Sequence, residues 1–314
     1  DMARLCSWIT PDIVVLTRLP DVPVHVEFFA SPEAVVAEKM ELVHALPVTG
    51  TLVYNHDDEQ IRQVVSTLPQ TAIGFSRYSL SQYTASADQV RYEDGVPTGL
   101  EFKLTHLNTT LPLTVAGSLG VQHAYNYAAA VAVAAQFEIE TAEAVAALAV
   151  HQPPPGRMRL IAGLKDTIII DDTYNSSPTA AERALFALRE LRGAKRKIAV
   201  LGDMLELGQF STSEHEKLGA LAADCCDLLV TVGVRARKVA SGALAHGLSE
   251  KCILQYDSIE RAANELQPLI DRGDIILVKA SQSLRGERLV HELMAEPDRA
   301  AELLVRQDAA WQRR

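Results

Sequence analysis

The sequence has no apolar run long enough to cross a membrane, and it is poor in cysteine and in clustered positive charge. Its longest purely apolar stretch covers residues 127–135, whereas a transmembrane helix needs roughly 20 such residues. No signal peptide is recognisable either. The four cysteines include no Cys-x-x-Cys pair, which argues against a structural zinc site and is typical of buried thiols in a reducing cytoplasm. We therefore expect a cytoplasmic protein without membrane insertion.

Positive charge is scarce because 30 Lys and Arg residues are outnumbered by 40 Asp and Glu residues, which gives a formal net charge of −10. The only tight basic cluster is Lys195-Arg196-Lys197. We therefore expect no nucleic-acid partner, and any bound phosphate must be held by a few placed groups. An initiator methionine is missing as well, since the chain opens at Asp1, and this indicates a fragment.

What is present is the composition of a folded protein, with 48% hydrophobic and 22% charged residues among 314. At roughly 100–200 residues per domain this length suggests two domains. The first half mixes strands with helices, and a helix is expected to begin at Ser31-Pro32. Strands are predicted over 13–17, 51–54, 101–106 and 111–115, and further helices over 122–136 and 141–151.

A proline-rich stretch, Pro153-Pro154-Pro155-Gly156, can continue neither a helix nor a central strand and predicts a boundary between domains 1–155 and 156–314. After it, strand-like runs alternate with helical stretches, which is typical of a parallel sheet with helices on both faces. The fold class is therefore α/β, with a doubly wound second domain. Its strands are predicted over 167–170, 197–201, 228–232, 253–256 and 275–278, and its helices from Pro178, Ser213 (in a capping box with Glu216), Arg235, Ser258 and Arg285.

Polar loops follow three of these strands, at the edge where ligands bind in such sheets. In the first, 171–175, carboxylates precede a helix N-terminus, which suits a ribose or a phosphate but also a capped turn. The second, 202–208, brackets two carboxylates with glycines, a pattern that on general grounds is more typical of a solvated loop than of a binding site. The third, 279–285, carries two cations and two hydroxyls, which can hold an anion or simply begin a helix. Together we interpret them as the rim of an active site.

The strings DDTYNSSP (171–178), LGDMLELG (201–208) and VKASQSLRGE (278–287) resemble the Mur ligases. There the corresponding segments are approximately DDSYNANP, LGDMLELG and VKGSRSMRMEE. The resemblance continues through the first half in the same order, so it covers nearly the whole chain. It includes PDIVVLT (11–17), His25-Val26-Glu27 to Ser31, Lys39-Met40-Glu41, Asn55, Asn126 and Gly156-Arg157.

This resemblance implies a central ATPase domain over 1–155 and a Rossmann-like ligase domain over 156–314. The implied activity is ATP-dependent amide bond formation through an acyl phosphate, with ATP and Mg²⁺ as cofactors. LGDMLELG favours the family branch that adds D-alanyl-D-alanine to a UDP-N-acetylmuramoyl-tripeptide, in cytoplasmic peptidoglycan precursor synthesis. These two molecules are the partners that the resemblance implies, and a monomer is expected.

The resemblance also implies roles for individual residues. His25 corresponds to a magnesium ligand, and Lys39 to a lysine that several members carbamylate, which would create an anionic oxygen ligand for magnesium. Both are implied to be catalytic, as is Arg157 near the γ-phosphate. The implied nucleotide contacts are Asn126, Arg157, Asp172, Tyr174 and Asn175. Lys279, Ser281 and Arg285 are assigned to the incoming dipeptide or to contacts made on domain closure.

For four of these residues the alternative to the implied role is an ordinary structural or surface role. His25 is then a structural or solvated histidine, Lys39 an exposed helix lysine, and Asn126 a helix-face amide. Arg157 is then a surface charge of the linker.

The sequence departs from the family by lacking its phosphate-binding loop, because none of the nine lysines is followed by Ser or Thr. The family's UDP-sugar-binding domain and its Glu-Met-Gly segment are missing too. We expect the sequence to be the carboxyl-terminal part of a longer ligase, cut within its central ATPase domain, and inactive alone. Two alternatives stay open: another acid–amino-acid ligase, such as a folylpolyglutamate synthase or another muropeptide ligase, and a non-catalytic Mur-ligase-like binding module.

Overall fold

The computed structural model describes residues 2–313 and, among these, the side chains of all but Ala87 and Gln312. The chain folds into two compact units. The first comprises Asp1–Gln89, Leu100–Ala116 and Val121–His151, and the second comprises Val90–Gly99, Gly117–Gly120 and Gln152–Arg314. Short segments of the first half therefore cluster with the second unit, which a linear division of the sequence does not express.

The first unit is built on a six-stranded sheet whose strands lie in sequence order, and β1 to β4 pair in parallel. The strands are β1 (Ile13–Leu16), β2 (Thr51–Asn55), β3 (Thr71–Ser76), β4 (Tyr83–Glu93), β5 (Val96–His106) and β6 (Thr109–Ala116). The helices are α1 (Met2–Cys6), α2 (Pro32–His44), α3 (Glu59–Val65), α4 (Gln122–Ala134) and α5 (Thr141–Ala149).

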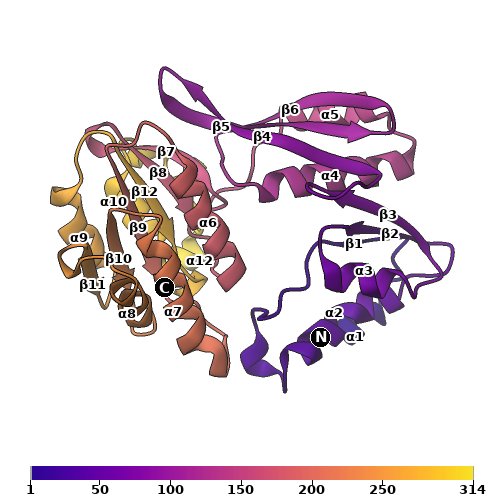
Figure 1. Cartoon of the computed structure of the whole chain (residues 1–314), viewed down its shortest axis with the longest axis horizontal. Helices are drawn as coiled ribbons and strands as arrows, with labels where there is room; N and C mark the ends of the chain where they lie inside the picture. Colours follow the sequence, from indigo (N-terminus) through magenta and orange to yellow (C-terminus); the bar gives the residue numbers. More distant parts are fainter. Residues whose placement is uncertain (1, 314) are drawn as a thin grey trace. The chain divides into compact units, whose positions relative to one another are not determined.

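Hydrophobic side chains cover both faces of this sheet, because successive residues of a strand point to opposite sides. Leu52 of β2 packs in one cluster with Ile61 of α3, while Val53 packs in another with Tyr127 of α4. Figure 1 shows α2 and α3 on one side of β1 to β3 and α4 on the other. Ser31 caps the N-terminus of α2, as predicted from its place before Pro32.

The second unit contains a six-stranded sheet in the order β11-β10-β9-β12-β8-β7. Its strands are β7 (Arg159–Gly163), β8 (Thr167–Asp172), β9 (Arg196–Gly202), β10 (Leu228–Val232), β11 (Ile253–Tyr256) and β12 (Asp274–Lys279). β8 to β12 are parallel, which confirms the predicted α/β class, while β7 pairs antiparallel with β8 and was not predicted. The α-helices are α6 (Pro178–Glu190), α7 (Ser211–Ala223), α8 (Arg237–Ala245), α9 (Ile259–Leu269), α10 (Glu287–Leu293), α11 (Ala300–Leu303) and α12 (Ala309–Gln312).

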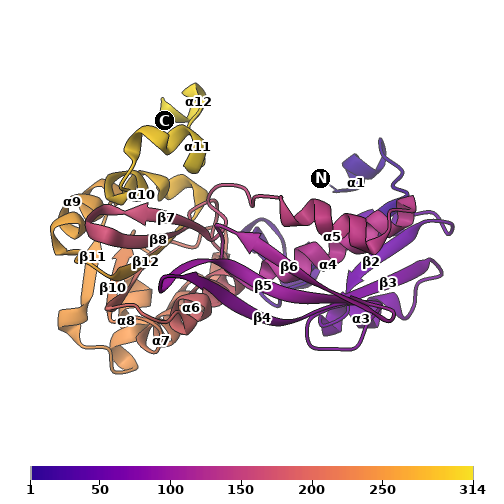
Figure 2. The same ribbon diagram turned by 90° about the horizontal axis from the view of Figure 1, so that it is seen from above.

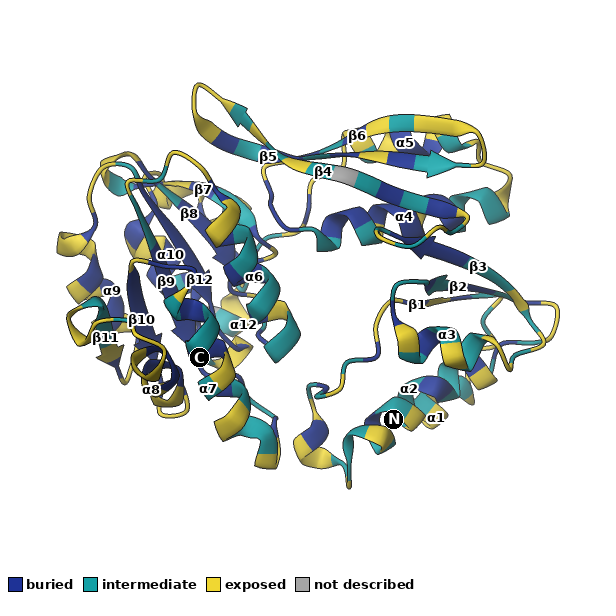
Figure 3. Ribbon diagram, in the orientation of Figure 1, coloured by how far each residue is buried: buried dark blue, intermediate teal, exposed yellow. Residues whose placement is uncertain are grey.

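Helices cover both faces of this second sheet. Ile198 and Val200 of β9 pack in one cluster with Leu266 of α9 and Leu289 of α10. Figures 1 and 2 show α6, α7 and α8 on the opposite face. The strands between these layers are buried, as the dark ribbons of Figure 3 show. Because strands buried on both faces are mostly apolar, they were visible in the sequence as nearly continuous hydrophobic runs.

The predicted capping box at the start of α7 is wrong. The helix begins at Ser211, and the Ser213 hydroxyl donates to the carbonyl oxygen of Phe210 at 3.0 Å. Glu216 instead forms an ion pair with Lys238 of α8 at 3.2 Å. The motif spacing is present, but the first turn starts two residues earlier, so the carboxylate faces the neighbouring helix.

The prediction of buried thiols holds for half of the cysteines. Cys225 and Cys226 are buried, whereas Cys6 and Cys252 are partly exposed, and all four are free. Among residues 2–313, no helix combines the length and the apolarity needed to cross a bilayer.

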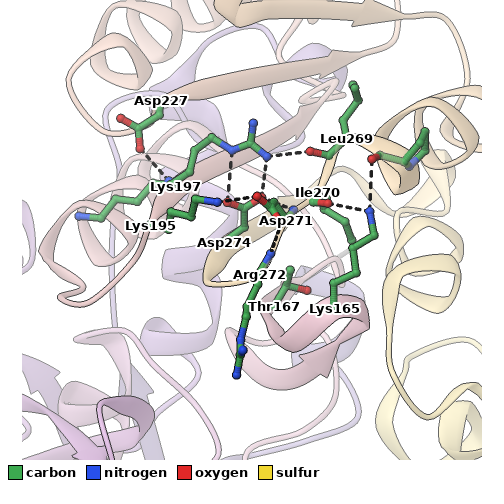
Figure 4. A network of polar contacts seen from close by, with 12 residues as sticks. Lys165, Thr167, Lys195, Lys197, Asp227, Leu269, Ile270, Asp271, Arg272 and Asp274 are labelled. Atoms are coloured by element: carbon green, nitrogen blue, oxygen red, sulfur yellow. Dashed lines mark hydrogen bonds and ion pairs between the residues drawn. The ribbon is translucent and has the colours of Figure 1, made fainter.

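The amino-end edge of the second sheet carries a network of charges that are paired with one another, as Figure 4 shows. Arg196 binds both carboxylate oxygens of Asp274, at 3.3 and 2.6 Å. Lys195 binds Asp271 at 2.5 Å, and Lys165 donates to the carbonyl oxygen of Ile270 at 2.8 Å. These cations stabilise the turn after α9, so the basic cluster noted in the sequence has a structural role.

Candidate active site

The carboxyl ends of β8 and β12 bring several predicted site residues together. Lys279 is the register partner of Asp172, and its Nζ lies 2.5 Å from Asp172 Oδ2. The same ammonium donates to the carbonyl oxygen of Asn175 at 3.0 Å. Because Lys279 is only 2% exposed, its charge is held within the protein and orders the loop that follows β8.

The linker before β7 joins this loop. The guanidinium carbon of Arg157 lies 4.0 Å from the centre of the Tyr174 ring, a cation–π contact. The amide of Tyr174 donates to the carbonyl oxygen of Gly156 at 3.1 Å, and the amide of Met158 donates to Asp172 Oδ1 at 3.2 Å. Gly156 has φ 70°, and a Cβ there would lie 3.0 Å from the Tyr174 nitrogen, so only glycine fits. The structure therefore places Arg157, Asp172 and Tyr174 side by side.

Asp171 lies directly before this group and is fully buried. Its Oδ1 accepts hydrogen bonds from the amide and the hydroxyl of Thr173, at 3.2 and 2.6 Å. Its Oδ2 has no hydrogen-bond partner among the described residues. Burial raises the pKa of Asp171 to about 6 although the bonds from Thr173 favour the anion. A carboxyl that changes charge near neutral pH thus lies beneath the loop.

The loop after β9 is tied to the loop after β12. The amide of Ser281 donates to the carbonyl oxygen of Asp203 at 3.2 Å, and its hydroxyl oxygen accepts from the amide of Leu205 at 3.0 Å. Asp203 Oδ1 accepts from the amide of Ala236 at 2.7 Å. The predicted substrate residue Ser281 therefore links two strand-end loops, and one of the two carboxylates of LGDMLELG points inward.

His215 of α7 supports the same loop and was not predicted from the sequence. It is fully buried, and its Nε2 accepts a hydrogen bond from the amide of Met204 at 2.9 Å. Its Nδ1 lies 2.6 Å from the carbonyl oxygen of Ser211, so Nδ1 carries the ring hydrogen. Burial lowers the pKa of His215 below its ordinary value, which favours the neutral ring. A lone histidine on a helix carries no motif that could have revealed this role.

Arg285 makes internal contacts. It has φ 59°, its Nε donates to Glu287 Oε1 at 2.5 Å, and its Nη1 donates to the carbonyl oxygen of Trp311 at 2.8 Å. The residue is 9% exposed. These contacts compete with its predicted role toward the dipeptide, which stays a prediction.

The remaining predicted residues belong to the first unit. His25 is exposed and has φ 71°. Lys39 of α2 is partly buried, and burial lowers the pKa of its ammonium, which increases the neutral amine that carbamylation requires. Asn126 is exposed on α4. The preceding residue, Tyr125, anchors this helix by donating its hydroxyl hydrogen to Asp57 Oδ2 at 2.9 Å.

The described part of the chain does not contain a complete magnesium site. The described residues contain no group of three or more His, Cys, Asp or Glu side chains that could hold a metal ion. His25 and a carbamylated Lys39 would supply one nitrogen and one oxygen donor, whereas octahedral Mg²⁺ prefers oxygen ligands from carboxylates, phosphates and water. The residues present therefore do not fit the ion by themselves, and these two ligands stay a prediction.

Comparison with known proteins gives a consistent result along the chain. The Mur ligase middle domain matches residues 1–134, and the Mur ligase glutamate ligase domain matches residues 156–282. UDP-N-acetylmuramoyl-tripeptide–D-alanyl-D-alanine ligase of Bacillus subtilis (strain 168) is 28% identical over 299 residues, covering 94% of this chain and 61% of the relative. The enzyme of that name from Escherichia coli (strain K12) is 27% identical over 301 residues, covering 93% and 62%. The chain thus spans less than two thirds of the length of these curated relatives.

Solved structures resemble the chain as well. MurF ligase from Thermotoga maritima, in complex with ADP, has a TM-score of 0.77 and 25% identity, and the match covers 92% of this chain and 63% of that one. MurF from Acinetobacter baumannii has a TM-score of 0.76 at 22% identity, with coverage of 92% and 61%, and supports the fold alone. These matches confirm the α/β fold and the predicted resemblance.

Proposed function

This chain belongs to the Mur ligase family, and we propose that in its natural protein it serves the ATP-dependent joining of D-alanyl-D-alanine to a UDP-N-acetylmuramoyl-tripeptide. One observation carries the proposal. Arg157, Asp172, Tyr174 and Lys279 converge at the carboxyl edge of the second sheet, in a chain whose relatives bear the name of that ligase. We place the reaction in cytoplasmic peptidoglycan precursor synthesis.

The reaction has two steps. The γ-phosphoryl group of ATP passes to the tripeptide carboxylate, giving an acyl phosphate and ADP. The dipeptide amine, after losing its ammonium proton, then attacks the acyl carbon. The new C–N bond forms as the C–O bond to phosphate breaks, phosphate leaves, and the nitrogen loses a second proton to solvent to become the amide. Both steps move negative charge between oxygens, so fixed cations and hydrogen-bond donors are the groups that lower the barrier.

The residues of the second unit suit the nucleotide in this scheme. Arg157 is exposed and its guanidinium is held over the Tyr174 ring, so it can pair with phosphate oxygens. Tyr174 is 46% exposed and offers a flat surface to a base or a ribose. Asp172 is held by Lys279 and by the amide of Met158, which orients its carboxylate for a ribose hydroxyl.

A non-catalytic nucleotide-binding module is the second candidate. It rests on the contacts of Arg157, Tyr174 and Asp172, which suit nucleotide binding whether or not a phosphoryl group is transferred. Because no lysine of the 314 residues is followed by Ser or Thr, the pattern that provides the phosphate cradle in nucleotide-hydrolysing folds, we expect the 314-residue chain alone to show no turnover. The two candidates therefore differ in whether the natural protein turns over substrate.

The test is ATP-dependent phosphate release by the natural protein with the UDP-muramoyl tripeptide and one of three amines: D-alanyl-D-alanine, D-glutamate or L-glutamate. We expect turnover with the dipeptide. Arg157→Ala should raise the KM for ATP about tenfold, the effect of roughly 1.4 kcal/mol. Arg192→Ala, which removes an exposed arginine of the same unit, should leave it unchanged.

The other outcomes select the alternatives. Turnover with glutamate but not with the dipeptide would favour another acid–amino-acid ligase. ADP binding without turnover of any amine would favour the binding module. Turnover by the 314-residue chain alone would contradict the expectation that a phosphate cradle is needed.

A further inference from the structure

A buried group of charges lies next to the loop after β8 and joins the end of the VKASQSLRGE string to Arg306, a residue that no motif marks. It consists of Arg285, Glu287 and Arg306, whose side chains are 11%, 1% and 5% exposed. Glu287 accepts from Arg285 at 2.5 Å and from Arg306 at 2.6 Å. Burial alone would raise the pKa of Glu287, but the two arginines hold it below its ordinary value, so the carboxylate stays ionised. The group therefore carries one net positive charge.

Arg306 also binds the backbone of the loop after β8. Its Nη2 donates to the carbonyl oxygen of Thr173 at 2.6 Å, and its Nη1 donates to that of Tyr174 at 3.1 Å. The neighbouring Val305 packs closely against Gly156 of the linker, because a Cβ on Gly156 would lie 2.9 Å from Val305 Cγ1. The segment after α11 thus contacts both the loop and the linker that carries Arg157.

Only an arginine can make all of these contacts. Its planar guanidinium presents five N–H donors in fixed directions and so binds two carbonyl oxygens and a carboxylate together, whereas a lysine ammonium is a compact charge on a flexible stem. Both side chains tolerate the left-handed backbone of residue 306 equally poorly, since φ is 59° there. A lysine at this position therefore keeps the positive charge and the left-handed backbone but loses the set of N–H donors in fixed directions.

We propose that Arg306 is a positioning residue, which holds the Thr173–Tyr174 backbone and thereby fixes the Tyr174 ring beneath the Arg157 guanidinium for a nucleotide. The inference rests on the proposed function for the identity of the ligand. It needs no such premise for the hold on the loop, because that hold consists of the hydrogen bonds from Arg306 to the carbonyl oxygens of Thr173 and Tyr174. It adds to the site a residue that touches neither substrate nor nucleotide.

The first test is amide hydrogen exchange in Arg306→Lys. The Tyr174 amide, bonded to the Gly156 carbonyl, reports the loop, and the Leu277 amide in the middle of β12 reports global stability. We expect the Tyr174 amide to exchange at least about tenfold faster, as one lost charge-assisted hydrogen bond predicts. Arg299→Lys is the matched control, because Arg299 is 49% exposed in the same C-terminal segment and pairs there with Glu296 and Glu302 on the surface.

An unchanged Tyr174 rate, or a rise matched by the Leu277 amide, would overturn the proposal. The second test measures ADP affinity and, in the natural ligase, the KM values. Arg306→Lys should weaken ADP binding and raise the KM for ATP while the KM for D-alanyl-D-alanine stays constant. Equal ADP affinity in Arg306→Lys and Arg299→Lys would also overturn the positioning role. If the wild-type protein binds no ADP, the proposed function fails, and the exchange rates alone still decide whether Arg306 holds the loop.

Discussion

Replacing Lys279 by methionine tests whether the ion pair with Asp172 is structural. Methionine keeps the length and the apolar stem of lysine but removes the ammonium, so that the Asp172 carboxylate loses its ion pair and keeps the hydrogen bond from the amide of Met158. Removing one partner of a buried pair costs about 3–5 kcal/mol. Because the Asp172 side chain is 10% exposed and water can reach part of it, we expect the lower end of this range, about 3 kcal/mol, for Lys279→Met.

Two further variants make the measurement specific. In the double variant Lys279→Met, Asp172→Asn the unpaired carboxylate charge is absent. The double variant should therefore lose less stability than the sum of the two single losses, by about 2 kcal/mol. Lys195→Met is the matched control. It removes a lysine whose pair with Asp271 is 61% exposed on both sides, so we expect a loss below about 0.5 kcal/mol.

The assay is urea unfolding of the whole chain, followed through a fluorescence signal that comes from the second unit alone. The protein has two tryptophans, Trp8 in the first unit and Trp311 in the second, so a Trp8→Phe background leaves Trp311 as the reporter. This separation matters because two units need not unfold in one transition. An unchanged unfolding midpoint in Lys279→Met, or strict additivity in the double variant, would refute the structural role. Lys279 would then be available to bind the dipeptide, as the sequence motif suggested.

Two other predictions concern a histidine and a lysine. Because burial lowers the pKa of His215 in the folded state, its contribution to stability is present above pH 6.5, the ordinary value, and is lost as the pH falls below it. The urea midpoint of the wild type should therefore fall more between pH 7 and pH 5.5 than that of His215→Gln, and equal slopes would contradict this. Lys39→Ala should strongly reduce ligase turnover of the natural protein, with partial rescue by short carboxylic acids, because burial lowers the pKa of the amine that would be carbamylated. Undiminished turnover would remove Lys39 from the site.

Local signals predicted most of the regular structure. The hydrophobic runs of β8 to β12 were found within one or two residues, since a strand buried on both faces is apolar along most of its length. Ser31 before Pro32 predicted the start of α2 for an equally local reason, the need to satisfy free amides. The same rule was wrong at Ser213, where the turn beginning at Ser211 took precedence and Glu216 found a partner on another helix. Short-range patterns reveal what a segment favours but not which alternative wins.

The sequence by itself determined the family, the α/β class and the three polar loops, because these depend on residue types and spacing along the chain. Only the tertiary structure decided which charges are available to a ligand. Lys279 is paired with Asp172, which is 107 residues away, because β12 lies beside β8 in the sheet. Arg306 reaches the Tyr174 carbonyl across 132 residues. Such pairings follow from strand order and packing, and no local pattern encodes them, so the placement of the loop after β8 had to come from the fold.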